Sequence, residues 1–209
     1  MAPVKLTGLP SSVALMTGAA SLVVTLSACG SDASDTSSSD PSFDDLFSSS
    51  VTAQAASTCP AAAPPRGGTP EWTVPGTTGS VAVTGSTDVT APQVEVTAPF
   101  SVDETQVHTL TPGDGPVVAP TASVSVCYMG VNGRDGSVFD TSFKGGPPVE
   151  FPLDGVVPGF QKAIAGQKVG STVAVAMVPA DGYPQGQPAA GIEPGDTLVF
   201  AIEIVDATN

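Results

Sequence analysis

The chain has 209 residues, of which 20 are Asp or Glu and 6 are Lys or Arg, so its formal net charge at pH 7 is −14. This length predicts one modest domain with extensions. Nucleic acid is excluded as a partner, because phosphate binding needs clustered Lys and Arg that this chain lacks. The acidity is typical of a surface that keeps a protein soluble.

The first segment is typical of an export signal. Lys5 precedes an apolar run at about 13–26, which is too short for an obvious spanning helix because a bilayer core needs roughly 20 apolar residues. The ending Leu-Ser-Ala-Cys at Cys29 resembles the bacterial lipoprotein signal, in which the cysteine is lipidated and becomes the first residue. A plain secretory signal cut near Ala28 is the alternative.

The lipoprotein interpretation predicts where the protein resides. Residues 1–28 would be the signal peptide, and acyl chains on Cys29 would tether the exported protein to the outer face of the cell membrane without a spanning segment. Residues 29–75 would be a flexible stalk and a Pro/Gly-rich lead-in, since 30–57 are mostly Ser, Asp, Ala and Thr and bury too little surface to offset the entropy of ordering. A short interaction helix at 41–48 is the alternative.

Two cysteines remain if Cys29 is lipidated. An exported protein meets an oxidising compartment in which leftover cysteines pair, so we predict a disulfide between Cys59 and Cys127. Two unpaired thiols are the alternative. Strand alternation in 123–128 places Cys127 on the opposite face from Tyr128. His108 has no second histidine beside it, so a metal site or a Cys–His nucleophile is not expected.

The remaining chain has the pattern of an α+β domain, an antiparallel sheet wrapped over one short helix. Short edge strands are expected at 81–83 and 94–96, within a lead-in at 76–98. Residues 99–209 would form the domain, with strands near 105–111, 123–131, 149–153, 171–179 and 197–206. A helix is expected at 158–165, because Phe160, Ala163 and Ile164 form one apolar face between Pro158 and Gly166.

Several motifs within 99–209 together resemble one family. They are Tyr128-Met129-Gly130, Asp135-Gly136, Val138-Phe139-Asp140-Thr141-Ser142, Val156-Val157-Pro158-Gly159-Phe160, Gly170, Val178-Pro179, Tyr183 and Thr197-Leu198-Val199-Phe200. Their order and spacing are similar to those of the FKBP-type peptidyl-prolyl cis-trans isomerases. The resemblance implies a curved sheet around the helix and an isomerase that needs no cofactor and no metal.

The resemblance also implies an apolar pocket between sheet and helix that receives a proline ring. Carried over by position, the catalytic residues would be Tyr128, Phe139, Asp140 and Tyr183, and the substrate-binding residues would be Val149, Val156, Val157, Phe160, Ile192 and Phe200. Tyr183 matches the tyrosine whose hydroxyl bonds the substrate carbonyl, and the Val157 N–H matches a second donor. Val149, Pro184 and Gly191 depart from the family's pattern, which bears on substrate preference and affinity for macrolide inhibitors.

Asp140 follows two apolar residues, Val138 and Phe139, where a carboxylate is unusual. Beside an apolar pocket, this carboxylate can orient Tyr128 and present a fixed negative field to a twisting amide. The alternative is an Asp that caps the turn at Thr141 and Ser142.

The implied chemistry agrees with an apolar site. Rotation about an X-Pro amide has a barrier of roughly 18–20 kcal/mol because C–N resonance is lost, and a water-poor site favours the less charge-separated twisted amide. We therefore expect a monomeric isomerase that assists folding of exported, proline-containing polypeptides at the membrane surface. The alternatives are a non-catalytic FKBP-like chaperone or partner-binding module, and a purely structural β-sandwich on a lipid stalk.

Overall fold

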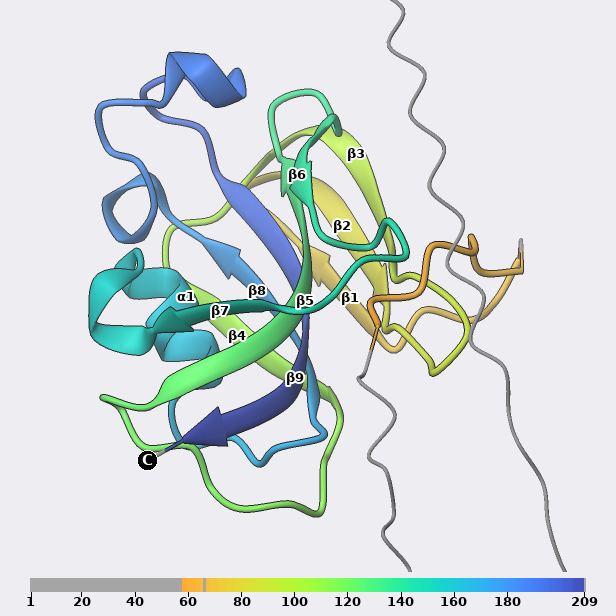
Figure 1. Cartoon of the computed structure of the whole chain (residues 1–209). Coiled ribbons are helices and arrows are strands. Elements are labelled where there is room, and N and C mark those ends of the chain that lie inside the picture. The colour runs from red at the N-terminus through yellow and green to blue at the C-terminus, as the bar shows by residue number, and fades with distance from the viewer. Residues whose placement is uncertain (1–57, 66, 209) are drawn as a thin grey trace, which may run out of the picture. The chain divides into compact units, whose positions relative to one another are not determined.

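The computed structural model describes residues 58–65 and 67–208. The expected signal peptide, Cys29 and the alternative helix at 41–48 lie outside the described residues. Two antiparallel sheets and one α-helix make up the described part of the chain (Figure 1). Within it, no helix combines the length and the apolar character that crossing a bilayer would require.

The larger sheet has six strands, in the order β4-β8-β9-β5-β6, with β7 also paired to β5. Their bounds are β4 (Gln106–Thr111), β5 (Ser123–Asn132), β6 (Val138–Thr141), β7 (Val149–Pro152), β8 (Thr172–Met177) and β9 (Leu198–Thr208). The long pair β5 and β9 extends from Ser123↔Thr208 to Asn132↔Leu198, with a shift of register between Ser125 and Val126. The strands expected in this part of the chain are confirmed, apart from small differences at their ends.

Helix α1 (Pro158–Ile164) covers one face of the larger sheet (Figure 1). Pro158 occupies the first turn, where a missing N–H costs nothing. Phe160, Ala163 and Ile164 are buried and belong to the main apolar core with side chains of β5, β8 and β9. Gly166 follows the helix with a φ of 83°, a conformation that glycine adopts readily. The expected α+β fold, a sheet wrapped over one helix, is confirmed.

Three short 3₁₀ helices complete the described elements and flank the segments that carry the site. They are η2 (Leu153–Gly155), η3 (Pro179–Asp181) and η4 (Pro188–Ala190). The first leads from β7 into α1, and the other two lie between β8 and β9.

A smaller sheet covers the opposite face of the larger one. It contains β1 (Trp72–Pro75), β2 (Thr78–Thr84) and β3 (Gln93–Ser101) in that order. Valines of β1 and β2 and Phe100 of β3 form a second core with Ala174, Ala176, Val199 and Ala201 of β8 and β9. Both faces of these two strands are therefore buried.

This second layer differs from the expected lead-in at two points. β1 lies within 29–75, where extended chain was expected, and β3 crosses the expected boundary between 76–98 and 99–209. Trp72 of β1 stacks on His108 of β4, with ring centroids 5.7 Å apart and planes 3° apart. The sequence gives little warning of β1, because only Trp72 and Val74 alternate there.

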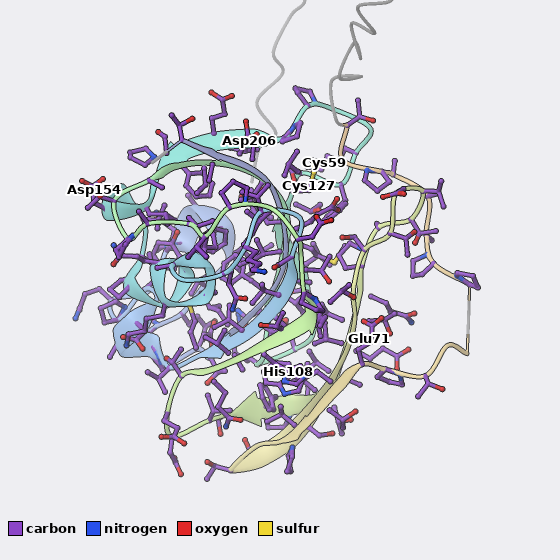
Figure 2. All side chains as sticks on the ribbon, turned by 90° about the horizontal axis from the view of Figure 1, so that it is seen from below. Cys59, Glu71, His108, Cys127, Asp154 and Asp206 are labelled. Atoms are coloured by element: carbon purple, nitrogen blue, oxygen red, sulfur yellow. A yellow bond between two sulfur atoms is a disulfide. The ribbon has the colours of Figure 1, made fainter. Side chains whose placement is uncertain are left out.

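A disulfide joins Cys59 of the lead-in to Cys127 of β5, with the two sulfur atoms 2.08 Å apart. Figure 2 labels both residues, which lie together beside the larger sheet. They form a third apolar cluster with Ala91 and Phe143, on the face of β5 opposite Tyr128 as alternation predicts. The lead-in is held there by backbone hydrogen bonds between Cys59 and the 145–146 segment.

Glu203 of β9 gives the fold a pH dependence. Its carboxylate accepts a hydrogen bond from the Ser86 hydroxyl at 2.7 Å. Burial raises the pKa of Glu203 above its ordinary value of 4.5, and the Asp88 charge raises it further, whereas the Ser86 hydrogen bond opposes the rise. Because the pKa of Glu203 is raised, the folded state binds the Glu203 proton more tightly than the unfolded state does. Protonated Glu203 therefore favours the folded state at low pH, and this contribution to the free energy of unfolding is lost as pH rises through the folded-state pKa.

We expect Glu203→Gln to raise the free energy of unfolding at pH 7, because the amide keeps an acceptor for Ser86 and carries no charge to desolvate. Urea denaturation at several pH values between 4 and 8 measures this, and the variant should lose less stability than the wild type as pH rises. Glu104→Gln, at an exposed position, is the matched control. Equal pH profiles for the wild type and Glu203→Gln would contradict the expectation.

Candidate active site

A pocket of about 410 Å³ opens between α1 and the larger sheet. Strands β5, β6, β7 and β9 contribute to its walls, together with the segment that leads into α1 and the connection after β8. Its lining residues are Tyr128, Phe139, Asp140, Val149, Phe151, Gly155, Val156, Val157, Phe160, Tyr183 and Phe200.

The floor of the pocket is aromatic. Phe160 and Phe200, each 5% exposed, meet edge to face with ring centroids 5.2 Å apart. Phe139 meets Phe200 at 5.5 Å and Tyr128 meets Phe160 at 5.9 Å, both close to perpendicular. Such edge-to-face pairs are favourable beyond the area they bury. The rings can approach because Gly130 lies beneath them: a Cβ there would be 2.6 Å from Phe139 and 2.8 Å from Phe200.

Asp140 stands at the rim of this floor and is hydrogen-bonded to Tyr128. The Tyr128 hydroxyl donates to Asp140 Oδ2 at 2.6 Å. Burial raises the pKa of Tyr128, and the hydrogen bond to Asp140 raises it further, so the phenol stays protonated as a donor. The following turn is capped instead by Thr141, whose hydroxyl accepts from the Phe143 N–H at 3.1 Å. Of the two alternatives for Asp140, the geometry favours orientation of Tyr128.

Tyr183 lies on the other side of the pocket, in the connection from β8 to β9. Within the described part of the chain its hydroxyl has no hydrogen-bond partner, which leaves it able to donate to a ligand. Just before it, Asp181 accepts from Lys162 Nζ of α1 at 2.7 Å and from the Thr105 hydroxyl. Both hydrogen bonds lower the pKa of Asp181, and the one from Lys162 has the larger effect.

Val157 is the N-cap residue of α1, and its extended backbone turns the chain into the helix. Its N–H makes no hydrogen bond to any described residue, while its carbonyl accepts from Phe160 and Gln161. The Val157 N–H is therefore a second free donor at the pocket, as its position in the family pattern implies.

The structure brings together every predicted pocket residue except Ile192. Ile192 is 2% exposed and packs within the main core, because its bridge to Gln187 closes the loop and turns this side chain inward. Phe151 and Gly155 line the pocket and were not predicted. Alternation in β7 was an available signal for Phe151, which shares a face with Val149, whereas nothing in the sequence marks Gly155. The catalytic and binding roles stay predictions.

The site offers no obvious place for a metal. Among the described residues, no group of three or more His, Cys, Asp or Glu side chains is arranged to hold an ion. The polar groups at the pocket are hydroxyls, one carboxylate and backbone N–H groups, which can bind and orient a polar ligand edge over an apolar floor.

The described residues form an antiparallel α+β domain with an apolar pocket that has an aromatic floor. The model of the family described as FKBP-type peptidyl-prolyl cis-trans isomerase matches residues 115–205. The chain is 33% identical over 119 residues to the "Probable FK506-binding protein" of Corynebacterium glutamicum, covering 56% of this chain and 98% of that protein. The chain therefore belongs to the FKBP-type peptidyl-prolyl cis-trans isomerases, a family of enzymes, as its motifs predict.

Two other similar proteins are larger than the shared domain. The FKBP-type 22 kDa peptidyl-prolyl cis-trans isomerase of Escherichia coli is 37% identical over 101 residues, which is 48% of this chain and 48% of that protein. The crystal structure of a peptidyl-prolyl cis-trans isomerase from Pseudomonas syringae pv. tomato is 30% identical, with a TM-score of 0.45, and the match covers 50% of this chain and 76% of that one.

Proposed function

We propose that this protein isomerises X-Pro bonds in exported polypeptides by holding the proline ring in the pocket over Phe160. The observation that carries the proposal is the aromatic floor with free donors beside it. Phe160 and Phe200 exclude water from one side of a bound ring. Because the twisted amide is less charge-separated than the planar one, a site with little water favours it over the solvated ground state.

The polar groups at the rim have separate tasks in this mechanism. The Tyr183 hydroxyl donates to the substrate carbonyl and the Val157 N–H supplies a second donor, so the peptide is held while the amide turns. Asp140, fixed by Tyr128 at 2.6 Å, presents a constant negative field to the amide and takes no proton from it. No bond is broken, so a nucleophile is not required.

Tyr183→Phe and Asp140→Val are each expected to lower kcat/KM for a proline tetrapeptide about tenfold, since one hydrogen bond or one fixed charge near the amide is worth about 1.4 kcal/mol. The double variant should lower kcat/KM about a hundredfold in a direct cis-trans assay, since losses at independent sites add in free energy. Val138→Ala, at a side chain that is 52% exposed on the same strand as Asp140 and outside the pocket lining, is the matched control and should keep wild-type kcat/KM.

Two outcomes of this assay would change the assignment. A double variant as fast as the wild type would remove Tyr183 and Asp140 from the mechanism. A wild-type rate equal to that in buffer would favour the non-catalytic chaperone or partner-binding module, for which the departures at Val149, Pro184 and Gly191 are the supporting features. In the same proposal the protein is a monomer, and the family's macrolide inhibitors compete for the pocket.

The second part of the proposal concerns location: lipidation of Cys29 anchors the protein to the outer face of the cell membrane. The Leu-Ser-Ala-Cys ending supports it. Cys29→Ser is expected to move the protein from the membrane fraction to the soluble fraction and to abolish labelling by a fatty-acid analogue. Ser27→Thr, two residues earlier, is a control that keeps the cysteine. A wild type that is unlabelled and already in the soluble fraction would indicate the plain secretory signal cut near Ala28.

A further inference from the structure

The connection between β8 and β9 carries Tyr183 and is held by side-chain hydrogen bonds near both of its ends. At its start, Asp181 is bound by Lys162 of α1 and by Thr105. At its end, Asp196 lies just before β9 and is only 7% exposed. Between them the chain closes on itself through the Gln187–Ile192 bridge. The position of Tyr183 therefore depends on what holds these two ends.

Asp196 is the centre of a hydrogen-bond network in which Asp196 and Asn132 are buried and the Arg134 side chain is 39% exposed. Its carboxylate accepts from Asn132 Nδ2 at 2.6 Å and from Arg134 Nε at 3.1 Å. It also accepts from the Glu193 N–H at 2.8 Å, within its own loop. Arg134 extends the network by donating from Nη2 to the Gly191 carbonyl at 3.0 Å. A buried carboxylate needs such partners. The Arg134 guanidinium binds the loop at two points, because Nε donates to Asp196 and Nη2 donates to the Gly191 carbonyl.

The partners of Asp196 outside its loop come from the turn between β5 and β6. Asn132 ends β5, and its side chain accepts from the Arg134 N–H at 2.9 Å. The turn leads directly into β6, which places Phe139 and Asp140 in the pocket. The network thus joins the segment that carries one wall of the pocket to the loop that carries Tyr183 on another.

We propose that Arg134 and Asp196 are positioning residues that set the distance between the Tyr183 loop and the β5–β6 turn, and thereby the affinity of the pocket for a proline peptide. The inference rests on the proposed function of the pocket. Neither residue lines the pocket, so each acts through Tyr183. Loss of the network should leave the fold intact, because Ile192 still anchors the loop in the main core.

The test uses the full chain and the proline tetrapeptide assay. Arg134→Met keeps the length of the side chain and removes its donors, and it should raise KM about tenfold while kcat changes less than about twofold, since a small misplacement of a binding group weakens binding. Arg134→Lys restores one charged donor and should recover part of the loss. Lys168→Met removes an exposed lysine outside the pocket lining and should leave both constants unchanged.

Hydrogen exchange separates this inference from the proposed function. In Arg134→Met the amides of 186–195 should exchange faster while those of β5 and β9 stay as in the wild type. This result would support the positioning role even if the wild type proved inactive, in which case only the proposed function would fail. Wild-type KM together with wild-type exchange would overturn the inference. So would a lowered melting temperature with unchanged KM, which is the mark of a purely structural role.

Discussion

Replacing Phe160 with alanine is expected to lower the free energy of unfolding by about 3–5 kcal/mol and to abolish the acceleration of X-Pro isomerisation. The ring is 5% exposed and contacts Phe200, Phe151 and Tyr128 with centroid distances of 5.2, 5.4 and 5.9 Å. Its removal leaves a cavity in the core and takes away the floor on which a proline ring would rest. Urea denaturation measures the first effect, and the tetrapeptide assay at low temperature measures the second.

Phe100 provides the matched control for that variant. It is 2% exposed and lies in the second core, between the two sheets and away from the pocket. Phe100→Ala should lose a similar amount of stability and keep wild-type kcat/KM under conditions where it is folded. If Phe160→Ala is folded and retains wild-type kcat/KM, the pocket is not where the substrate binds.

Periodicity predicts the main core and the short strands at 81–83 and 94–96, which lie within β2 and β3. It does not predict that the smaller sheet covers the second face of the larger one. Alternation in β8 marks Val173, Val175 and Met177 as one buried face. Ala174 and Ala176 fall on the other face and are equally buried, because the smaller sheet covers them. Alanine suits a buried or an exposed position, so a strand of this composition does not reveal whether its second face is covered.

The pocket was predictable because the resemblance to the FKBP-type family carries its residues over by position. The network behind it was not. Arg134 and Asp196 lie on different segments, 62 positions apart, and each reads as an ordinary polar turn residue. Ile192 was predicted to line the pocket but is buried in the main core, since a loop residue can face either one. Only the closed path of the loop decides between them.

Removing the Cys59–Cys127 disulfide is expected to lower the free energy of unfolding by about 4 kcal/mol. The bond spans 68 positions and restricts the conformations open to the unfolded chain. Without it the unfolded state gains conformational entropy, which lowers the free energy of unfolding. The double variant Cys59→Ala with Cys127→Ala should show this loss in urea denaturation. Reduction of the wild type with a thiol reagent opens the same bond and keeps both buried sulfur atoms, so the double variant should lose somewhat more stability than the reduced wild type.

The same change is expected to leave the pocket working. Cys127 and Tyr128 are neighbours in β5 that point to opposite faces, so the hydrogen bond from Tyr128 to Asp140 does not depend on the sulfur atoms. The double variant should therefore keep wild-type kcat/KM at temperatures where it is folded. Iodoacetamide treatment of the native, unreduced protein followed by mass spectrometry tests whether the bond is formed. Adducts at both Cys59 and Cys127 would show that it is not, and the predicted loss of stability would then have no basis.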